Sequence, residues 1–125
     1  MKEVALIFVG GGLGSIVRFL LGRWVTTLHQ LNFPLGTLVV NIVACFVLGL
    51  IVGLVDHKQA FSAEARVFWA VGFCGGFSTF STFSYETLLL FQQPDAAGVV
   101  SGILYVVMSV ALCIGAVMMG VVVGR

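Results

Sequence analysis

Four long apolar stretches constrain the fold of this chain more than any other feature of its sequence. They cover about residues 4–27, 35–55, 65–91 and 96–123. A helix of about 20 mostly apolar residues is long enough to cross the hydrocarbon core of a membrane. The chain as a whole is only 9% charged, whereas soluble domains average about 25%. We therefore predict an all-α integral membrane protein in which residues 1–125 form a single domain of four transmembrane helices.

The charged and reactive residues exclude several classes of function. Six basic and five acidic residues nearly cancel, so no basic field favours a nucleic acid as partner. Cys45, Cys74 and Cys113 lie in apolar stretches without metal-ligand spacing, which is typical of small buried residues. There is no nucleophile–base arrangement and no phosphate-binding loop. We predict that the protein is not an enzyme.

The third stretch has a composition that a lipid-facing helix would not need. Residues 72–86 read Gly-Phe-Cys-Gly-Gly-Phe-Ser-Thr-Phe-Ser-Thr-Phe-Ser-Tyr-Glu. Gly75 and Gly76 each lower helix preference by about 1 kcal/mol, and the hydroxyls of Ser78 and Thr79 compete for backbone hydrogen bonds. We predict that this helix breaks near its middle and exposes carbonyls suited to a small cation. A plain kink without an ion is the alternative.

Aromatic rings and hydroxyls alternate just after the predicted break. Phe80 and Phe83 are three residues apart and share a helix face, with Ser81 and Thr82 between them. Ring edges carry partial positive charge and hydroxyls can donate hydrogen bonds, so this face could favour an anion. Ordinary packing of two phenylalanines is the alternative.

Other polar residues lie deep in the apolar stretches. Asn41 could line a polar path or form a hydrogen bond between helices. Arg18 and Glu86 are charges placed deeper than the loops, where they could border a watery vestibule or extend toward the membrane surface. Two rows at helical spacing add weakly polar lines, namely Thr37 with Asn41, and Tyr105 with Ser109 and Cys113. Together with the Phe/Ser/Thr face, these rows fit a narrow pore.

Glycine spacing indicates close helix contacts. Gly49 and Gly53 are four residues apart, the small-xxx-small spacing that lets helices approach. A chain of four short spans also has little interior room for a path of its own. From both features we predict an oligomer, most simply a dimer.

On these motifs the chain resembles the Fluc (CrcB-type) fluoride channels of bacteria. The resemblance covers nearly the whole chain: Gly14-x-x-x-Arg18, residues 36–41 (Gly-Thr-Leu-Val-Val-Asn) and, most specifically, residues 72–86. It implies a multi-pass protein of the bacterial inner membrane that lets fluoride leave passively and so resists its toxicity. It also implies an antiparallel, dual-topology homodimer with two pores.

The resemblance assigns roles to individual residues. Phe80 and Phe83 would present ring edges to fluoride, and Asn41 would be a pore-lining donor. Backbone carbonyls of Gly75 and Ser78 would hold a central structural sodium ion. Arg18 would lie near a vestibule. The remaining polar residues would surround the path: Ser81, Thr82, Glu86, Tyr105 and Ser109.

Two features depart from the family pattern. Cys113 stands where the polar row of the fourth helix commonly has a serine, and a thiol is a weak donor. Lys and Arg also favour one side of the membrane, with Lys2, Lys58, Arg66 and Arg125 opposite Arg23 and Arg18. Dual topology needs nearly balanced sides. This bias rests on few charges, so we keep the dual-topology prediction.

Two other functions compete with a channel. A proton-coupled multidrug antiporter of the small four-helix type needs a deep carboxylate in its first helix. The first stretch here has only Glu3 near its end, and its deep charge is Arg18. A non-transporting assembly subunit would use the polar positions for packing alone.

Overall fold

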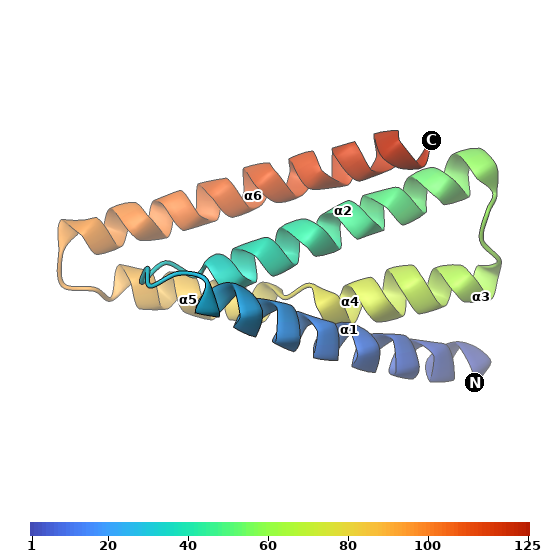
Figure 1. The fold of residues 1–125 in the computed structure, drawn as a ribbon, viewed down its shortest axis with the longest axis horizontal. Coiled ribbons are helices and arrows are strands. Elements are labelled where there is room, and N and C mark those ends of the chain that lie inside the picture. The colour runs from blue at the N-terminus through green and yellow to red at the C-terminus, as the bar shows by residue number, and fades with distance from the viewer.

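The computed structural model describes all of residues 1–125, which are helical except for short connections (Figure 1). Helices α1 (Lys2–Thr27), α2 (Leu35–Lys58) and α6 (Ala96–Gly124) are each long and apolar enough to cross a membrane. Between α2 and α6 lie shorter pieces: α3 (Ala63–Arg66), the π-helix η1 (Val67–Phe73), α4 (Cys74–Phe77) and α5 (Phe80–Phe91). The protein is therefore a multi-pass, all-helical membrane protein.

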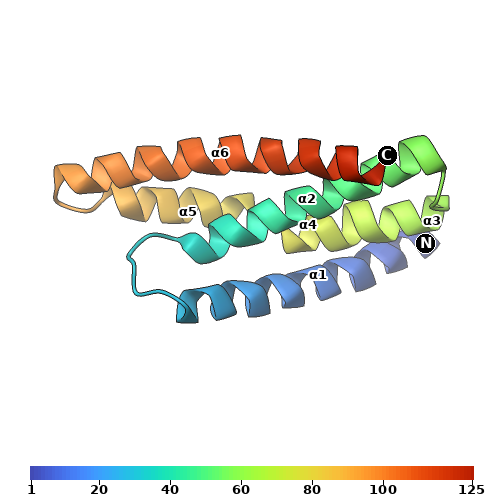
Figure 2. The ribbon, with the colours of Figure 1, turned by 45° about the horizontal axis from the view of Figure 1, so that its top comes forward.

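The helices run alternately in opposite directions. In Figures 1 and 2, the pieces from α3 to α5 follow one another along a single line, antiparallel to α2 and α6. Both chain termini lie at the same end of the molecule as the loop between α2 and α3. No single piece of this line reaches the length of a membrane span, because the helix is interrupted.

Helix α2 forms the centre of the molecule and contributes to both apolar clusters. Leu38 packs with Leu90 of α5 and Tyr105 of α6. One half-turn further along, Val40 and Ala44 pack against Phe77 of α4. Burial of these side chains fixes α2 against both halves of the interrupted line.

Glycines bring α2 and α6 into backbone contact. A Cβ atom on Gly49 would lie 2.2 Å from the carbonyl oxygen of Val117, and one on Gly53 would lie 2.5 Å from that of Val121. Both distances are far shorter than a van der Waals contact, so only glycine fits. The Gly49-x-x-x-Gly53 motif thus packs α2 against α6 of the same chain. It therefore does not support the oligomer that was predicted from this spacing.

Glycines also allow α1 to pack closely against η1 and α4. A Cβ on Gly14 would lie 2.1 Å from the carbonyl oxygen of Phe73, and one on Gly76 would lie 2.2 Å from that of Gly11. Helix α1 therefore packs directly on the backbones of η1 and α4.

The third stretch is interrupted near its middle, as predicted, at Ser78 and Thr79 and not at the glycine pair before them. Gly75 and Gly76 remain helical within α4, whereas Ser78 and Thr79 are extended, with φ/ψ of −82°/157° and −148°/118°. Gly76 is needed for contact with Gly11 rather than for flexibility. The Ser78 N–H still bonds to Cys74 in α4, and the helix ends there because the N–H and C=O of Thr79 bind outside it.

Candidate functional site

The break at Ser78 and Thr79 is closed by the side chain of Asn41 on α2. The Asn41 amide donates from Nδ2 to the Thr79 carbonyl (3.0 Å) and accepts at Oδ1 from the Thr79 N–H (2.8 Å). Both backbone groups of Thr79 are therefore satisfied without a helix. One N–H of the amide remains available after these two bonds.

The same bonds leave two carbonyls without their usual helical donors. In an uninterrupted helix the Thr79 N–H would bond to the carbonyl of Gly75, but it bonds to Asn41 instead. The Thr82 N–H would bond to the carbonyl of Ser78, but it bonds to Thr79 Oγ1 at 3.2 Å. Gly75 and Ser78 are also exposed. Two carbonyl oxygens, both hard ligands, are thus released at the surface of the chain.

Arg18 of α1 binds the end of α4. Its Nε donates to the carbonyl of Gly76 at 3.2 Å, and Ser15 Oγ donates to the same oxygen at 3.4 Å. A cation is favoured at a helix C-terminus, where the carbonyls give a partial negative charge. The terminal nitrogens of the guanidinium make no further protein bond.

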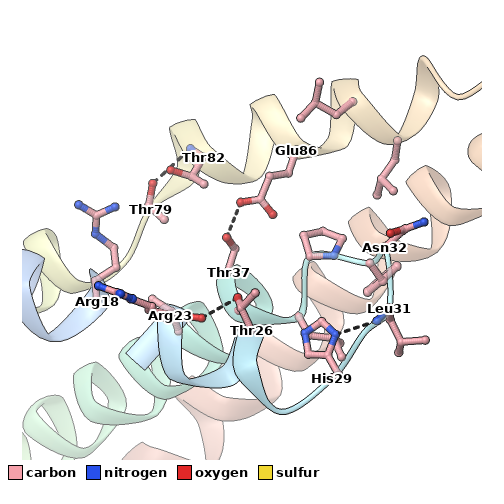
Figure 3. A pocket seen from close by; sticks show the side chains of 18 of the residues that line it. Arg18, Arg23, Thr26, His29, Leu31, Asn32, Thr37, Thr79, Thr82 and Glu86 are labelled. Carbon is pink, nitrogen blue, oxygen red and sulfur yellow. Dashed lines mark hydrogen bonds between the residues drawn. The ribbon is translucent and has the colours of Figure 1, made fainter. Parts of the chain in front are cut away.

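A first cavity of about 660 Å³ lies between the end of α1, the start of α2 and α5 (Figure 3). Arg18, Arg23 and Glu86 all line it. Glu86 accepts a hydrogen bond from the Thr37 hydroxyl at 2.5 Å. Figure 3 shows this bond bridging α5 and α2. The structure thus brings both predicted vestibule residues, Arg18 and Glu86, to one cavity with a net excess of positive charge.

A second cavity of about 250 Å³ opens onto the surface beside the break. It is lined from three elements by Asn41, Cys45, Ser78, Thr79, Phe80, Phe83, Ser109, Val110 and Cys113. The rings of Phe80 and Phe83 lie 5.6 Å apart, and 78% of Phe80 is exposed. The cavity is thus open on the side where Phe80 is exposed.

Thr79 lines both cavities, so the break forms the wall between them. Its hydroxyl lies 3.4 Å from that of Ser81, which is itself exposed and lines neither cavity. Thr82 lines the first cavity. The two cavities therefore meet at the Asn41–Thr79 pair, a region rich in hydrogen-bonding groups.

Two buried hydroxyls of α6 have no protein partner. Tyr105 is fully buried, with its ring 5.1 Å from that of Phe83 and edge-on to Phe33 at 5.4 Å. The Tyr105 hydroxyl and Ser109 Oγ make no hydrogen bond to protein atoms. A buried hydroxyl without a partner is costly, so both groups are free to donate to a ligand. Tyr105 lines neither cavity directly, while Ser109 and Cys113 line the second.

Sequence reasoning missed Arg23 as a residue of this site, although it lines the first cavity. Its position near the end of a predicted helix gave no sign of a role. Thr37 and Thr79 were singled out for other reasons, and only the structure shows that Thr37 binds Glu86 and that Asn41 binds the backbone of Thr79.

Comparison with known proteins identifies the family to which the chain belongs. Residues 5–121 match the family described as CrcB-like protein, Camphor Resistance (CrcB). The chain is 42% identical over 125 residues to a fluoride-specific ion channel FluC of Rhizobium leguminosarum bv. trifolii, covering all of this chain and 98% of that relative. It is 46% identical over 95 residues to a protein of the same name from Pyrococcus furiosus, covering 76% of each. The chain thus belongs to the CrcB-like family.

Proposed function

We propose that this protein is a fluoride-selective ion channel, and not an enzyme, that lets fluoride leave the cell passively. The relatives that match it over nearly their whole length are named as fluoride-specific ion channels. The observation that carries the proposal is the meeting of two cavities at the Asn41–Thr79 pair, beside the rings of Phe80 and Phe83. Fixed donors and ring edges in a narrow path favour the smallest halide.

The path would begin in the first cavity. Arg18 and Arg23 attract anions to it, while the hydrogen bond from Thr37 holds the Glu86 carboxylate to one side. An anion would then pass the remaining N–H of Asn41 and reach the edges of Phe80 and Phe83 in the second cavity. The unpartnered hydroxyl of Ser109, which lines the second cavity, would donate to it there, and Tyr105 would need to move to reach it.

A second copy of the chain would complete the second cavity. This cavity opens at the surface, and Phe80 and Ser78 are exposed there. A partner in the opposite orientation would cover this face and give two equivalent paths, one on each side of a two-fold axis. We therefore propose an antiparallel homodimer with four spans per chain in the bacterial inner membrane.

The residues at the break fit a structural sodium ion between the two copies. The carbonyls of Gly75 and Ser78 have lost their helical donors, and carbonyl oxygens suit a small hard cation. The space beside Gly75 is open, because a Cβ atom added there would have no neighbour within 4 Å. Two oxygens are too few for sodium, whereas two copies supply four. The ion would hold the exposed break of each chain against its partner.

The test is fluoride efflux from liposomes that contain the purified protein, measured with a fluoride electrode. We expect efflux that needs no proton gradient and excludes chloride. An antiporter would require the gradient, and an assembly subunit would pass nothing. Efflux equal to that of protein-free liposomes would contradict the proposal.

A further inference from the structure

Two cysteines of this chain face each other across α2 and α6. These helices run parallel (Figure 1), and Gly49 contacts Val117 while Gly53 contacts Val121. Both contacts step by four residues on each helix, so the register is constant over this region. Continued one turn toward the N-termini, the same register places Cys45 opposite Cys113.

Both thiols belong to the second cavity. Cys45 and Cys113 line it together with Phe80 and Phe83, and each is half-buried and free. Cys74 is also free, but it is buried at 4% exposure and does not line the cavity. The chain therefore presents one pair of thiols to this space and holds a third apart from it.

The ligand set restricts which metal such a pair can hold. No His, Asp or Glu joins the two cysteines, since no group of three or more such residues is close together in the structure. Structural zinc needs four ligands, so two thiols do not suit it. Thiolates select soft ions, and mercury(II) forms linear complexes with two of them.

The net charge of the complex also favours a divalent metal such as mercury(II) inside the membrane. A net charge inside the membrane is costly. A divalent ion bound by two thiolates is neutral, whereas a monovalent ion in the same site would leave a negative charge. A soft, divalent and two-coordinate ion therefore fits best.

We propose that Cys45 and Cys113 bind one mercury(II) ion and that the bound metal blocks the path beside Phe80 and Phe83. Two S–H protons leave to solvent, two S–Hg bonds form, and no atom changes oxidation state. The block of fluoride efflux rests on the proposed function, whereas the binding of the metal does not.

Metal binding is tested on the full-length protein in detergent, reduced, treated with mercury(II) chloride and washed with excess glutathione, a competing monothiol. Intact-mass spectrometry should find one mercury per chain and two protons lost, in both the native protein and Cys74→Ala. Cys45→Ser and Cys113→Ser should retain about tenfold less metal, because a single thiolate loses mercury to the competing thiol whereas two thiolates of one chain chelate it. Equal retention in Cys45→Ser or Cys113→Ser, or a bound mercury with only one proton lost in the native protein, would overturn the site.

The block is tested by efflux from liposomes, with each variant compared with its own untreated rate. Mercury(II) should stop fluoride efflux in the native protein and in Cys74→Ala, and dithiothreitol should restore it. The double variant Cys45→Ser/Cys113→Ser should keep its rate. Metal bound by both thiols with undiminished efflux would overturn the block. If untreated protein passes no fluoride, the channel proposal fails, while the mass measurement still decides the metal site.

Discussion

At the scale of single residues, Asn41 shows how one side chain can serve both structure and function. Sequence reasoning left open whether it bonds to another helix or lines a polar path. In the structure it bonds to the backbone of Thr79 in both directions, and it also lines the second cavity. The interhelical bond and the path are therefore compatible, because an amide has more hydrogen-bonding positions than Thr79 uses.

Replacing Asn41 by leucine should destabilise the fold. The N–H and C=O of Thr79 would lose their partners, and each unsatisfied buried group costs about 1–3 kcal/mol. We expect the free energy of unfolding in detergent to fall by about 2 kcal/mol or more. Asn32→Leu, at an exposed loop position, is the matched control and should change it little. Equal stability of Asn41→Leu and the native protein would mean that the break does not depend on this amide.

Replacing Phe80 or Phe83 by isoleucine should slow fluoride efflux while the oligomer still forms. Isoleucine keeps the apolar volume but has no ring edge to face an anion. We expect about a tenfold loss, which corresponds to about 1.4 kcal/mol. Phe8→Ile is the control, because Phe8 is exposed and lines neither cavity. Unchanged efflux in both variants would refute the role of these rings.

Glu64, outside the apolar stretches, gives a prediction that depends on pH. A backbone hydrogen bond at the start of α3, and then Lys2 at 3.5 Å, hold the pKa of its carboxyl below the usual range. A lowered pKa means that the ionised form stabilises the fold above the usual pKa and that this contribution is lost as pH falls. NMR titration should show the low pKa in the native protein and only a partial rise in Lys2→Gln. A full return to the usual value would assign the shift to Lys2 alone.

At the scale of helices, the contacts between backbones decide the packing. Gly49 and Gly53 touch α6, and Gly14 touches η1 and α4, so glycines that could have marked a dimer face are used within the chain. The position of the break follows from the same packing. Gly76 stays helical and packs against Gly11. The helix ends only at Thr79, where the side chain of Asn41 can bond to the backbone N–H and C=O.

Replacing Gly49 by alanine should separate α2 from α6. The added methyl would lie 2.2 Å from a backbone oxygen, which cannot move as a flexible side chain could. Overpacking costs about 1–3 kcal/mol, and we expect the free energy of unfolding to fall by about that amount. Gly115→Ala, on α6 with nothing within 4 Å, should leave stability unchanged or raise it by about 0.5–1 kcal/mol. Similar thermal unfolding of both variants would contradict this packing.

At the scale of the whole molecule, one chain leaves its candidate path open on one side. The second cavity opens at the surface beside the exposed ring of Phe80, and Gly75 and Ser78, whose carbonyls have lost their helical donors, are exposed as well. A second copy would enclose the path and provide enough oxygens for a cation. The oligomer is thus proposed from an incomplete site rather than from glycine spacing.

Sodium should stabilise the proposed dimer. An ion that binds only the assembled state adds about 1.4 kcal/mol for each tenfold rise in concentration above its dissociation constant. We expect replacement of sodium by choline, at constant ionic strength, to lower the temperature at which the purified dimer dissociates. A dimer that is equally stable in both salts would argue against the central ion.

The amino-acid sequence by itself determined the all-helical membrane class. Backbone groups in hydrocarbon must bond within their own segment, so long apolar stretches become helices whatever surrounds them. It also indicated the interruption between Gly72 and Glu86 and the residue types that border it. These are local properties of composition and need no knowledge of neighbours.

Only the tertiary structure decided where the helix breaks, what the glycines touch and which side chains share a cavity. Each depends on a partner distant in the sequence: Asn41 for Thr79, Val117 for Gly49, Arg18 for Gly76. Helical spacing gives the face on which a residue lies, but not which helix covers that face. The spacing of four marks the faces that carry Cys45 and Cys113, but only the backbone contacts show that these faces meet and in which register.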